Sequence, residues 1–157
     1  METIVLKIED GSNSENLVET IIARLKGNDE VKLIIEHTKS VKDRIKTLED
    51  ALQETGKTMP DFSGLPDEMR KRYNALFAIE VIAEVLNEGW TPNWDDETQK
   101  KWVPWFRSVS SGFVFDHTDY GYSFANAGRG SRLCFKSEEL AAYAGKKFVK
   151  LYEQFMM

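Results

Sequence analysis

The first 61 residues of this 157-residue chain contain no aromatic side chain, and all 4 Trp, 5 Tyr and 9 Phe lie from Phe62 onward. Aromatic rings contribute the largest buried areas to a protein core. The absence excludes a large core in the leading segment and places the main hydrophobic core after residue 60. We therefore expect the first sixty residues to form an accessory unit.

A single cysteine, Cys134, excludes an internal disulfide framework and a zinc site built on several thiolates. No apolar run approaches the roughly 18 residues that span a bilayer. The most apolar stretch, residues 75–86, is interrupted by Glu80 and Glu84. The first residues also lack the basic start and apolar stretch of a signal peptide. These absences predict a cytoplasmic protein without membrane contact.

An excess of positive charge is missing as well, since the formal net charge is −5. Residues 1–61 carry nine basic and thirteen acidic side chains, and residues 62–157 carry twelve and thirteen. Nonspecific nucleic-acid binding needs a positive surface that releases counterions. The composition therefore argues against a general nucleic-acid coat and leaves room only for a local basic patch on the second part.

The first part has the pattern of a small β-α-β-α unit over residues 1–56. Period-two alternation predicts a strand over 4–8, helical spacing predicts a helix over 17–25, and β-branched residues predict a second strand over 31–35. One further helix, over 41–52, is predicted from apolar residues spaced by four, three and four. Its narrow apolar stripe either packs on its own chain or forms a homodimer through this unit.

The second part, residues 65–157, is predicted to be an α+β domain after a linker at 57–64. A long helix is expected from Pro66 to a stop at Gly89, and a last helix is expected to follow the cap Ser137. Between them lie a tryptophan-rich loop and an aromatic-rich antiparallel sheet of three to four strands, which the two helices flank. The candidate strands are 102–106, 112–116, 120–124 and 132–136, with turns that include 117–119.

Two stretches resemble known groups of proteins. Over about 58–157, the segments Met59–Pro66, Asn87–Trp94, Pro104–Phe106 and Gly130–Ser137 resemble small proteins common in bacteriophages and prophages. This group has no assigned activity, so the resemblance implies a phage-related context and carries no catalytic residue over. Residues 3–35 resemble the start of many short bacterial antitoxin-like proteins.

Few residues are available for catalysis. The natural nucleophile–base pair is Cys134 with His117, as in a cysteine-dependent hydrolase, and flanking Arg132 and Lys136 would lower the pKa of an outward-facing thiol. The alternative is that Cys134 is a small buried residue. Residues 116–119, with the sequence Asp-His-Thr-Asp, offer metal ligands or, more economically, a β-turn. We expect no catalytic site, no metal site and no cofactor.

The candidate binding residues are tryptophans and arginines. Trp90 and Trp94 are either surface anchors or core residues. Arg129 and Arg132 lie in a glycine-rich segment that could hold an anion or could be a plain connection. Together with Arg107, these residues form the predicted binding set.

The pattern favours a non-enzymatic binding or adaptor module that engages another protein. The alternatives are a nucleic-acid-binding protein that uses Arg107, Arg129, Arg132 and exposed aromatics, and a cysteine-dependent hydrolase.

Overall fold

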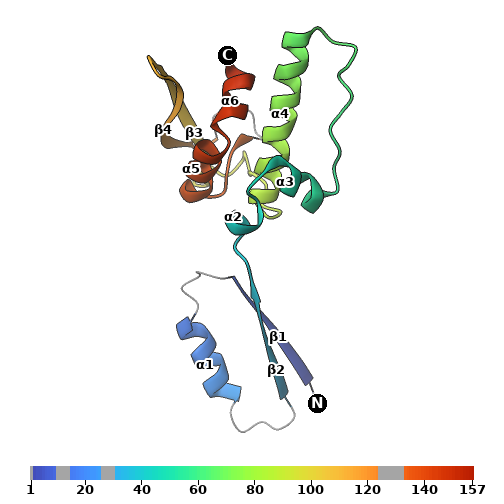
Figure 1. The fold of residues 1–157 in the computed structure, drawn as a ribbon. Helices are drawn as coiled ribbons and strands as arrows, with labels where there is room; N and C mark the ends of the chain where they lie inside the picture. The colour runs from blue at the N-terminus through green and yellow to red at the C-terminus, as the bar shows by residue number, and fades with distance from the viewer. Residues whose placement is uncertain (1, 10–14, 26–30, 124–132) are drawn as a thin grey trace. The chain divides into compact units, whose positions relative to one another are not determined.

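The computed structural model describes residues 2–9, 15–25, 31–123 and 133–157. It divides into two compact units, Met1–Arg44 and Ile45–Met157 (Figure 1). Each unit has its own helices and strands, so the fold is α+β as predicted. Among the described residues, no helix is long and apolar enough to cross a bilayer.

The first unit is a parallel strand pair joined by a helix. Strands β1 (Glu2–Glu9) and β2 (Val31–Thr38) pair in parallel, from Glu2 opposite Val31 to Glu9 opposite Thr38. Parallel neighbours need a crossover between them, and α1 (Glu15–Leu25) lies at that place in the chain. The predicted β-α-β order is confirmed, and the short helix α2 (Val41–Arg44) follows.

The single helix predicted over 41–52 is wrong, because the chain breaks after α2 and restarts as α3 (Leu48–Thr55). Thr47 caps α3: its hydroxyl accepts from the Asp50 amide at 3.2 Å, and the Asp50 carboxylate accepts from the Thr47 amide at 2.8 Å. This reciprocal capping box favours a helix start at this point. Apolar spacing alone does not reveal it.

Helix α3 belongs to the second unit, where it packs on α4 (Asp67–Leu86). Ile45 is fully buried and Leu48 and Leu52 are half-buried, so most of the stripe predicted for a small separate unit lies in the larger one. The observed division, after Arg44, therefore precedes the segment 57–64 that was predicted as the linker.

Helix α4 begins and ends where the sequence predicts. Pro66 precedes its first turn, where acidic side chains favour the positive end of the helix dipole. At its C-terminal end, Glu88 and Gly89 have φ values of 48° and 82°, a left-handed conformation that suits glycine. Helices α3 and α6 (Val149–Met156) both pack on α4 (Figure 1). Its buried side chains are Ala75, Ala78, Ile79, Val81, Ile82, Ala83, Val85 and Leu86.

The sheet of the second unit has two antiparallel strands in the described residues, not three to four. Strands β3 (Lys101–Val109) and β4 (Gly112–Gly121) form a hairpin, with an irregularity at Pro104, which cannot donate a ladder hydrogen bond. The predicted turn at 117–119 is wrong, because β4 continues through it while pairing with Val103 and Pro104.

The predicted strand over 132–136 is reduced to one bridge in the described residues. Phe135 exchanges backbone hydrogen bonds with Trp102, at 3.0 Å and 2.8 Å. The pairing does not extend beyond Phe135, because the chain enters α5 (Glu138–Lys147) only three residues later. Ser137 caps this helix, and its hydroxyl accepts from the Leu140 amide.

Helices α5 and α6 replace the single last helix of the prediction and break at Phe148. Helix α5 packs across β3 and β4, and its Gly145 lies against a residue of each strand. A Cβ atom at Gly145 would lie 2.5 Å from Cδ2 of Phe115 and 2.7 Å from Cβ of Pro104. This contact leaves room for no side chain, so glycine is required there.

The core of the second unit is mainly aliphatic rather than aromatic. Phe135 is fully buried, but the other largest fully buried side chains are aliphatic and come mostly from α4. Several rings lie at the surface instead, led by Trp105 at 43% exposure. Most of the core lies after residue 60, as the sequence predicts, but Ile45 and Ala51 precede that position and also belong to it, and the core contains fewer rings than expected.

Candidate binding pocket

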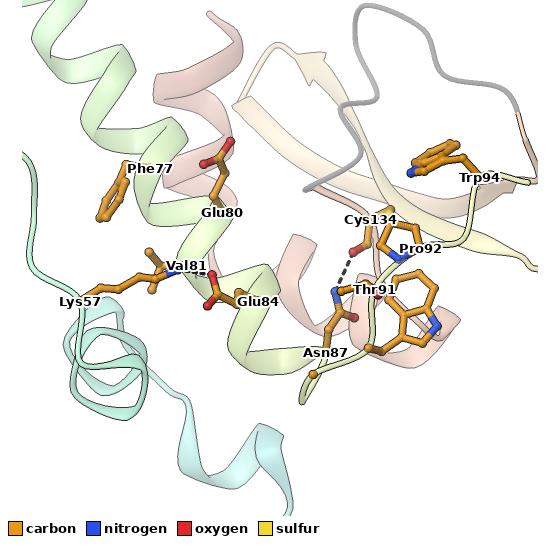
Figure 2. A pocket seen from close by; sticks show the side chains of 12 residues that line it. Lys57, Phe77, Glu80, Val81, Glu84, Asn87, Thr91, Pro92, Trp94 and Cys134 are labelled. Carbon is orange, nitrogen blue, oxygen red and sulfur yellow. Dashed lines mark hydrogen bonds and ion pairs between the residues drawn. The ribbon is translucent and has the colours of Figure 1, made fainter.

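A half-open cavity of about 740 Å³ lies in the second unit, against the C-terminal half of α4 (Figure 2). We call it the α4 pocket. One wall is the face of α4 that carries Phe77, Glu80 and Glu84. The other wall is the loop 89–94, which follows the helix. Lys57 lies at the rim, and the buried floor is formed by Val81, Asn87 and Cys134.

Asn87 fixes the floor by joining the end of α4 to a segment 47 residues further along the chain. Its side-chain amide donates to the Cys134 carbonyl at 2.8 Å, and its side-chain oxygen accepts from the Lys136 amide at 2.9 Å (Figure 2 shows the first bond). Only 5% of Asn87 is exposed. A buried amide that makes both bonds holds two chain segments in one arrangement.

A buried lysine stabilises the loop wall. Lys101 is only 2% exposed, and its ammonium group donates to the carbonyls of Asp96 and Gln99 at 3.2 Å and 3.0 Å. The same ammonium group lies 5.3 Å from the centre of the Trp94 ring. A buried charge requires such partners. Lys101 therefore fixes the loop and holds Trp94 in place.

Hydrogen bonds within the loop add to this rigidity. The Asp96 carboxylate accepts from the Thr98 hydroxyl at 2.7 Å and from the Thr98 amide at 2.8 Å. These bonds, helped by the Gln99 amide and the charge of Lys101, hold the pKa of Asp96 below its usual value despite some desolvation. The Gln99 side chain also accepts from the Asn93 amide at 2.7 Å.

The helical wall carries two carboxylates one turn apart. Phe77, Glu80 and Glu84 follow spacings of three and four, which place them on one face of α4. Lys57 forms an ion pair with Glu84 across the rim (Figure 2). The pocket therefore combines aromatic surface with two carboxylates and one ammonium group.

Cys134 is an unsuitable nucleophile in this environment. Burial raises the pKa of its thiol to about 11, although a backbone hydrogen bond and the charge of Lys101 act in the opposite direction. The thiolate, which is the reactive form, is then scarce at neutral pH.

The predicted base His117 is not brought to this thiol. It lies on β4, contacts the Asp116 carboxylate at 2.8 Å and stacks on Trp105 with 5.7 Å between ring centres. No histidine lines the α4 pocket among the described residues. The predicted nucleophile, Cys134, and the predicted base, His117, therefore lie at different sites.

The structure brings together only part of the predicted binding set. Trp90 and Trp94 both line the α4 pocket. Arg107 lies on β3, where it pairs with Asp116 at 3.0 Å, and it does not line the pocket. Arg129 and Arg132 lie outside the described residues.

The alternative metal site at residues 116–119 is not supported by the structure. These residues lie in or beside the pairing of β4 with β3 rather than in a loop. In the described ranges, no group of three or more His, Cys, Asp or Glu side chains could hold a metal ion.

Sequence reasoning missed most of the helical wall. Phe77 does not stand out in the sequence as a binding residue, and Glu80 and Glu84 are notable there only because they interrupt the most apolar stretch. A signal was present, because two glutamates four residues apart interrupt the most apolar stretch of the chain. The role of Asn87 had no local signal, since its partners Cys134 and Lys136 are distant in sequence.

No family model matches the chain, and neither curated proteins nor solved structures give a significant match. The resemblances of residues 58–157 to phage and prophage proteins and of residues 3–35 to antitoxin-like proteins therefore stay predictions. Any functional argument must rest on the geometry of the α4 pocket.

Proposed function

We propose that the protein is a non-enzymatic binding module that engages another protein through the α4 pocket. The observation that carries this proposal is the placement of Trp90 and Trp94 in one wall of a cavity of about 740 Å³, opposite Phe77. Binding cavities typically have volumes of about 300–1,000 Å³ and combine apolar walls with a few placed polar groups. Tryptophan is also among the residues that contribute most to protein interfaces.

The chemistry of the pocket supports binding rather than catalysis. Its thiol, Cys134, has a raised pKa and is buried in the floor. Its amide, Asn87, already uses both functional atoms in hydrogen bonds to the backbone. Catalysis by a nucleophile needs an adjacent base that activates it. The described part of the pocket has no such pair.

Charge supports a protein partner over a nucleic acid at this site. Glu80 and Glu84 line the pocket, and the whole chain carries a net charge of −5. The net negative charge of the chain disfavours the approach of a phosphate backbone. A half-open pocket with aromatic walls and a charged rim matches the usual anatomy of a protein interface.

Photo-crosslinking from the pocket rim tests the proposal. Thr91 is exposed and lines the pocket, so a benzoylphenylalanine placed there should give a discrete protein adduct in cells. The same group at Ser110, which is exposed at the hairpin turn, serves as the control. We expect the Thr91 adduct alone to disappear when Trp90→Ala or Trp94→Ala is added. An adduct that both tryptophan substitutions leave intact would rule out the pocket as the binding site.

A second candidate function, nucleic-acid binding, is favoured by a cluster of rings at the open end of the hairpin, where Tyr120 and Tyr122 are exposed. Trp102 and Tyr120 lie 4.8 Å apart, Tyr122 lies 5.5 Å from Tyr120, and the Lys100 ammonium group is 4.4 Å from the Tyr120 ring centre. Rings and cations together can stack on unpaired bases. This candidate predicts single-strand binding that weakens steeply with salt and is lost in Tyr120→Ala. Salt-independent binding would exclude it.

A further inference from the structure

The sheet of the first unit is small. Its parallel strands β1 and β2 are the only two strands of that sheet among the described residues (Figure 1). Two paired strands alone are marginal in water, and parallel sheets normally have both faces covered. No aromatic side chain lies in the first 61 residues to enlarge the core of this unit. Such a sheet gains stability when further strands join it.

We propose that the outer edge of β2 pairs with the same edge of a second copy of the chain, in an antiparallel register centred on Ile34. Each β2 would then lie between its own β1 and the β2 of the second copy, in a joint sheet of four strands. A sheet edge presents backbone N–H and C=O groups that make it a template for another strand. The two-fold axis through the centre of the pair closes the assembly as a dimer.

The charges along β2 select this register. In an antiparallel pair centred on Ile34, Lys32 lies opposite Glu36 of the second copy, and the two-fold axis generates the same pair a second time. Opposite charges at facing positions stabilise an antiparallel pair, and like charges destabilise it. Moving the centre by one residue in either direction removes both opposite-charge pairs, because Lys32 then faces a neutral residue.

The same register also matches the apolar positions of the two copies. Successive residues of a strand alternate between the faces of a sheet, and residues that face each other across two strands share a face. With the centre at Ile34, Leu33 faces Ile35 of the second copy and Ile34 faces itself. Within each copy, Leu33 and Ile35 are in register with Ile4 and Leu6 of β1. The apolar rows of both copies would thus lie on one face of the four-stranded sheet.

Strand β1 offers no comparable register. Its charged residues are Glu2, Lys7 and Glu9. A two-fold pair must be centred on a residue, because facing positions share a face. In each such pair of β1 that places five or more residues opposite one another, Lys7 lies outside the pair, faces a neutral residue or faces another Lys7. Self-complementary charge therefore favours the edge of β2 over that of β1.

Two charge variants test the register by sedimentation equilibrium. Lys32→Glu and Glu36→Lys each place like charges opposite each other twice in a homodimer, so each variant should dimerise roughly ten- to hundred-fold more weakly than the unsubstituted chain. A heterodimer of the two variants regains opposite charges at both positions, so an equimolar mixture should dimerise again. Glu19→Lys is the control, because it makes the same change of charge at an exposed position of α1 and should dimerise like the unsubstituted chain.

A cysteine at the centre of the register gives a second test. Facing Cα atoms in an antiparallel pair lie about 4.5–5.5 Å apart, which a disulfide can span. Ile34→Cys should therefore form a crosslinked dimer under mild oxidation. Ile35→Cys is the control, because position 35 faces Leu33, and position 35 of the second copy lies about 7–8 Å away on the diagonal. The native Cys134 is buried and should contribute little.

Restored dimers in the mixture of charge variants, together with preferential crosslinking through Ile34→Cys, would support the β2 interface. An unsubstituted chain that stays monomeric at high concentration, a mixture that does not dimerise, or equal crosslinking of Ile34→Cys and Ile35→Cys would overturn it. The α4 pocket lies in the second unit and does not include β2. The outcome is therefore independent of the Thr91 crosslink that tests the proposed function.

Discussion

Replacing Asn87, the residue that caps the C-terminal end of α4, with alanine should strongly destabilise the second unit. The change removes the donor to the Cys134 carbonyl and the acceptor for the Lys136 amide. Solvent compensates little for the loss of the first bond, because Asn87 is only 5% exposed and Cys134 is buried. The second bond is partly buried, so water can compensate for some of its loss.

The expected magnitude follows from these two bonds. A buried group left without a partner costs about 1–3 kcal/mol, and a partly solvated one costs about 1 kcal/mol. The free energy of unfolding should therefore fall by about 2–4 kcal/mol, a large share of the roughly 5–15 kcal/mol that domains possess. Asn87→Asp separates the two bonds, because an ionised carboxylate can accept from Lys136 but cannot donate to Cys134.

Urea unfolding followed by tryptophan fluorescence measures this loss selectively, since all four tryptophans lie between residues 90 and 105 of the second unit. A shift of about 1–2 M in the midpoint is expected from typical urea slopes. Asn74→Ala on the same helix is the control, and it should change the midpoint little, because Asn74 is only half-buried and α4 favours alanine. Equal midpoints for the Asn87→Ala and Asn74→Ala variants would refute the bridging role of Asn87.

Two further predictions concern the packing of α5 and the reactivity of the pocket floor. Gly145→Ala should destabilise the second unit by about 1–3 kcal/mol in the same assay, because overpacking against Phe115 and Pro104 outweighs the usual helical gain from alanine of about 1 kcal/mol. The control Gly64→Ala, where the added Cβ meets nothing, should be neutral, and a neutral Gly145→Ala would contradict the close approach. Cys134, with its pKa raised to about 11, should react with iodoacetamide at pH 8 on the order of 100-fold more slowly in the folded protein than in urea. The rate in the folded protein should rise as the pH approaches the raised pKa, and similar rates in both states would disprove the burial.

Local chemistry made the ends of helices predictable. Pro66 and Gly89 mark the limits of α4 because a missing amide and a left-handed φ act within one or two residues. The start of α3 also has a local signal, the capping box of Thr47 and Asp50. The apolar spacing continues across this position, so it predicted one uninterrupted helix instead. The break of the last helix at Phe148 left no comparable mark in the sequence.

Strand lengths and partners were less predictable, because they depend on residues far away in the chain. Residues 116–119 have strong turn preferences, yet pairing with β3 extends β4 through them. Local preference is routinely overruled by such pairing. The same reason explains why Trp90 and Trp94 could be proposed as binding residues while their opposite wall could not: the two walls meet only after folding.

The substitutions Asn87→Ala and Gly145→Ala should both lower stability, but only Asn87→Ala should change the pocket itself. Lys101 and the hydrogen bonds of Asp96 fix the loop wall, while packing in the second unit fixes α4. Asn87 lies where α4 ends and this loop begins, and its bonds set the floor between the two walls. We therefore expect Asn87→Ala to weaken the Thr91 crosslink even under conditions in which the variant is fully folded. Gly145 does not line the pocket, so Gly145→Ala should lose stability and keep the crosslink. If both variants, compared while folded, lose the crosslink to the same extent, the pocket depends on the packing of the whole unit rather than on the Asn87 bridge.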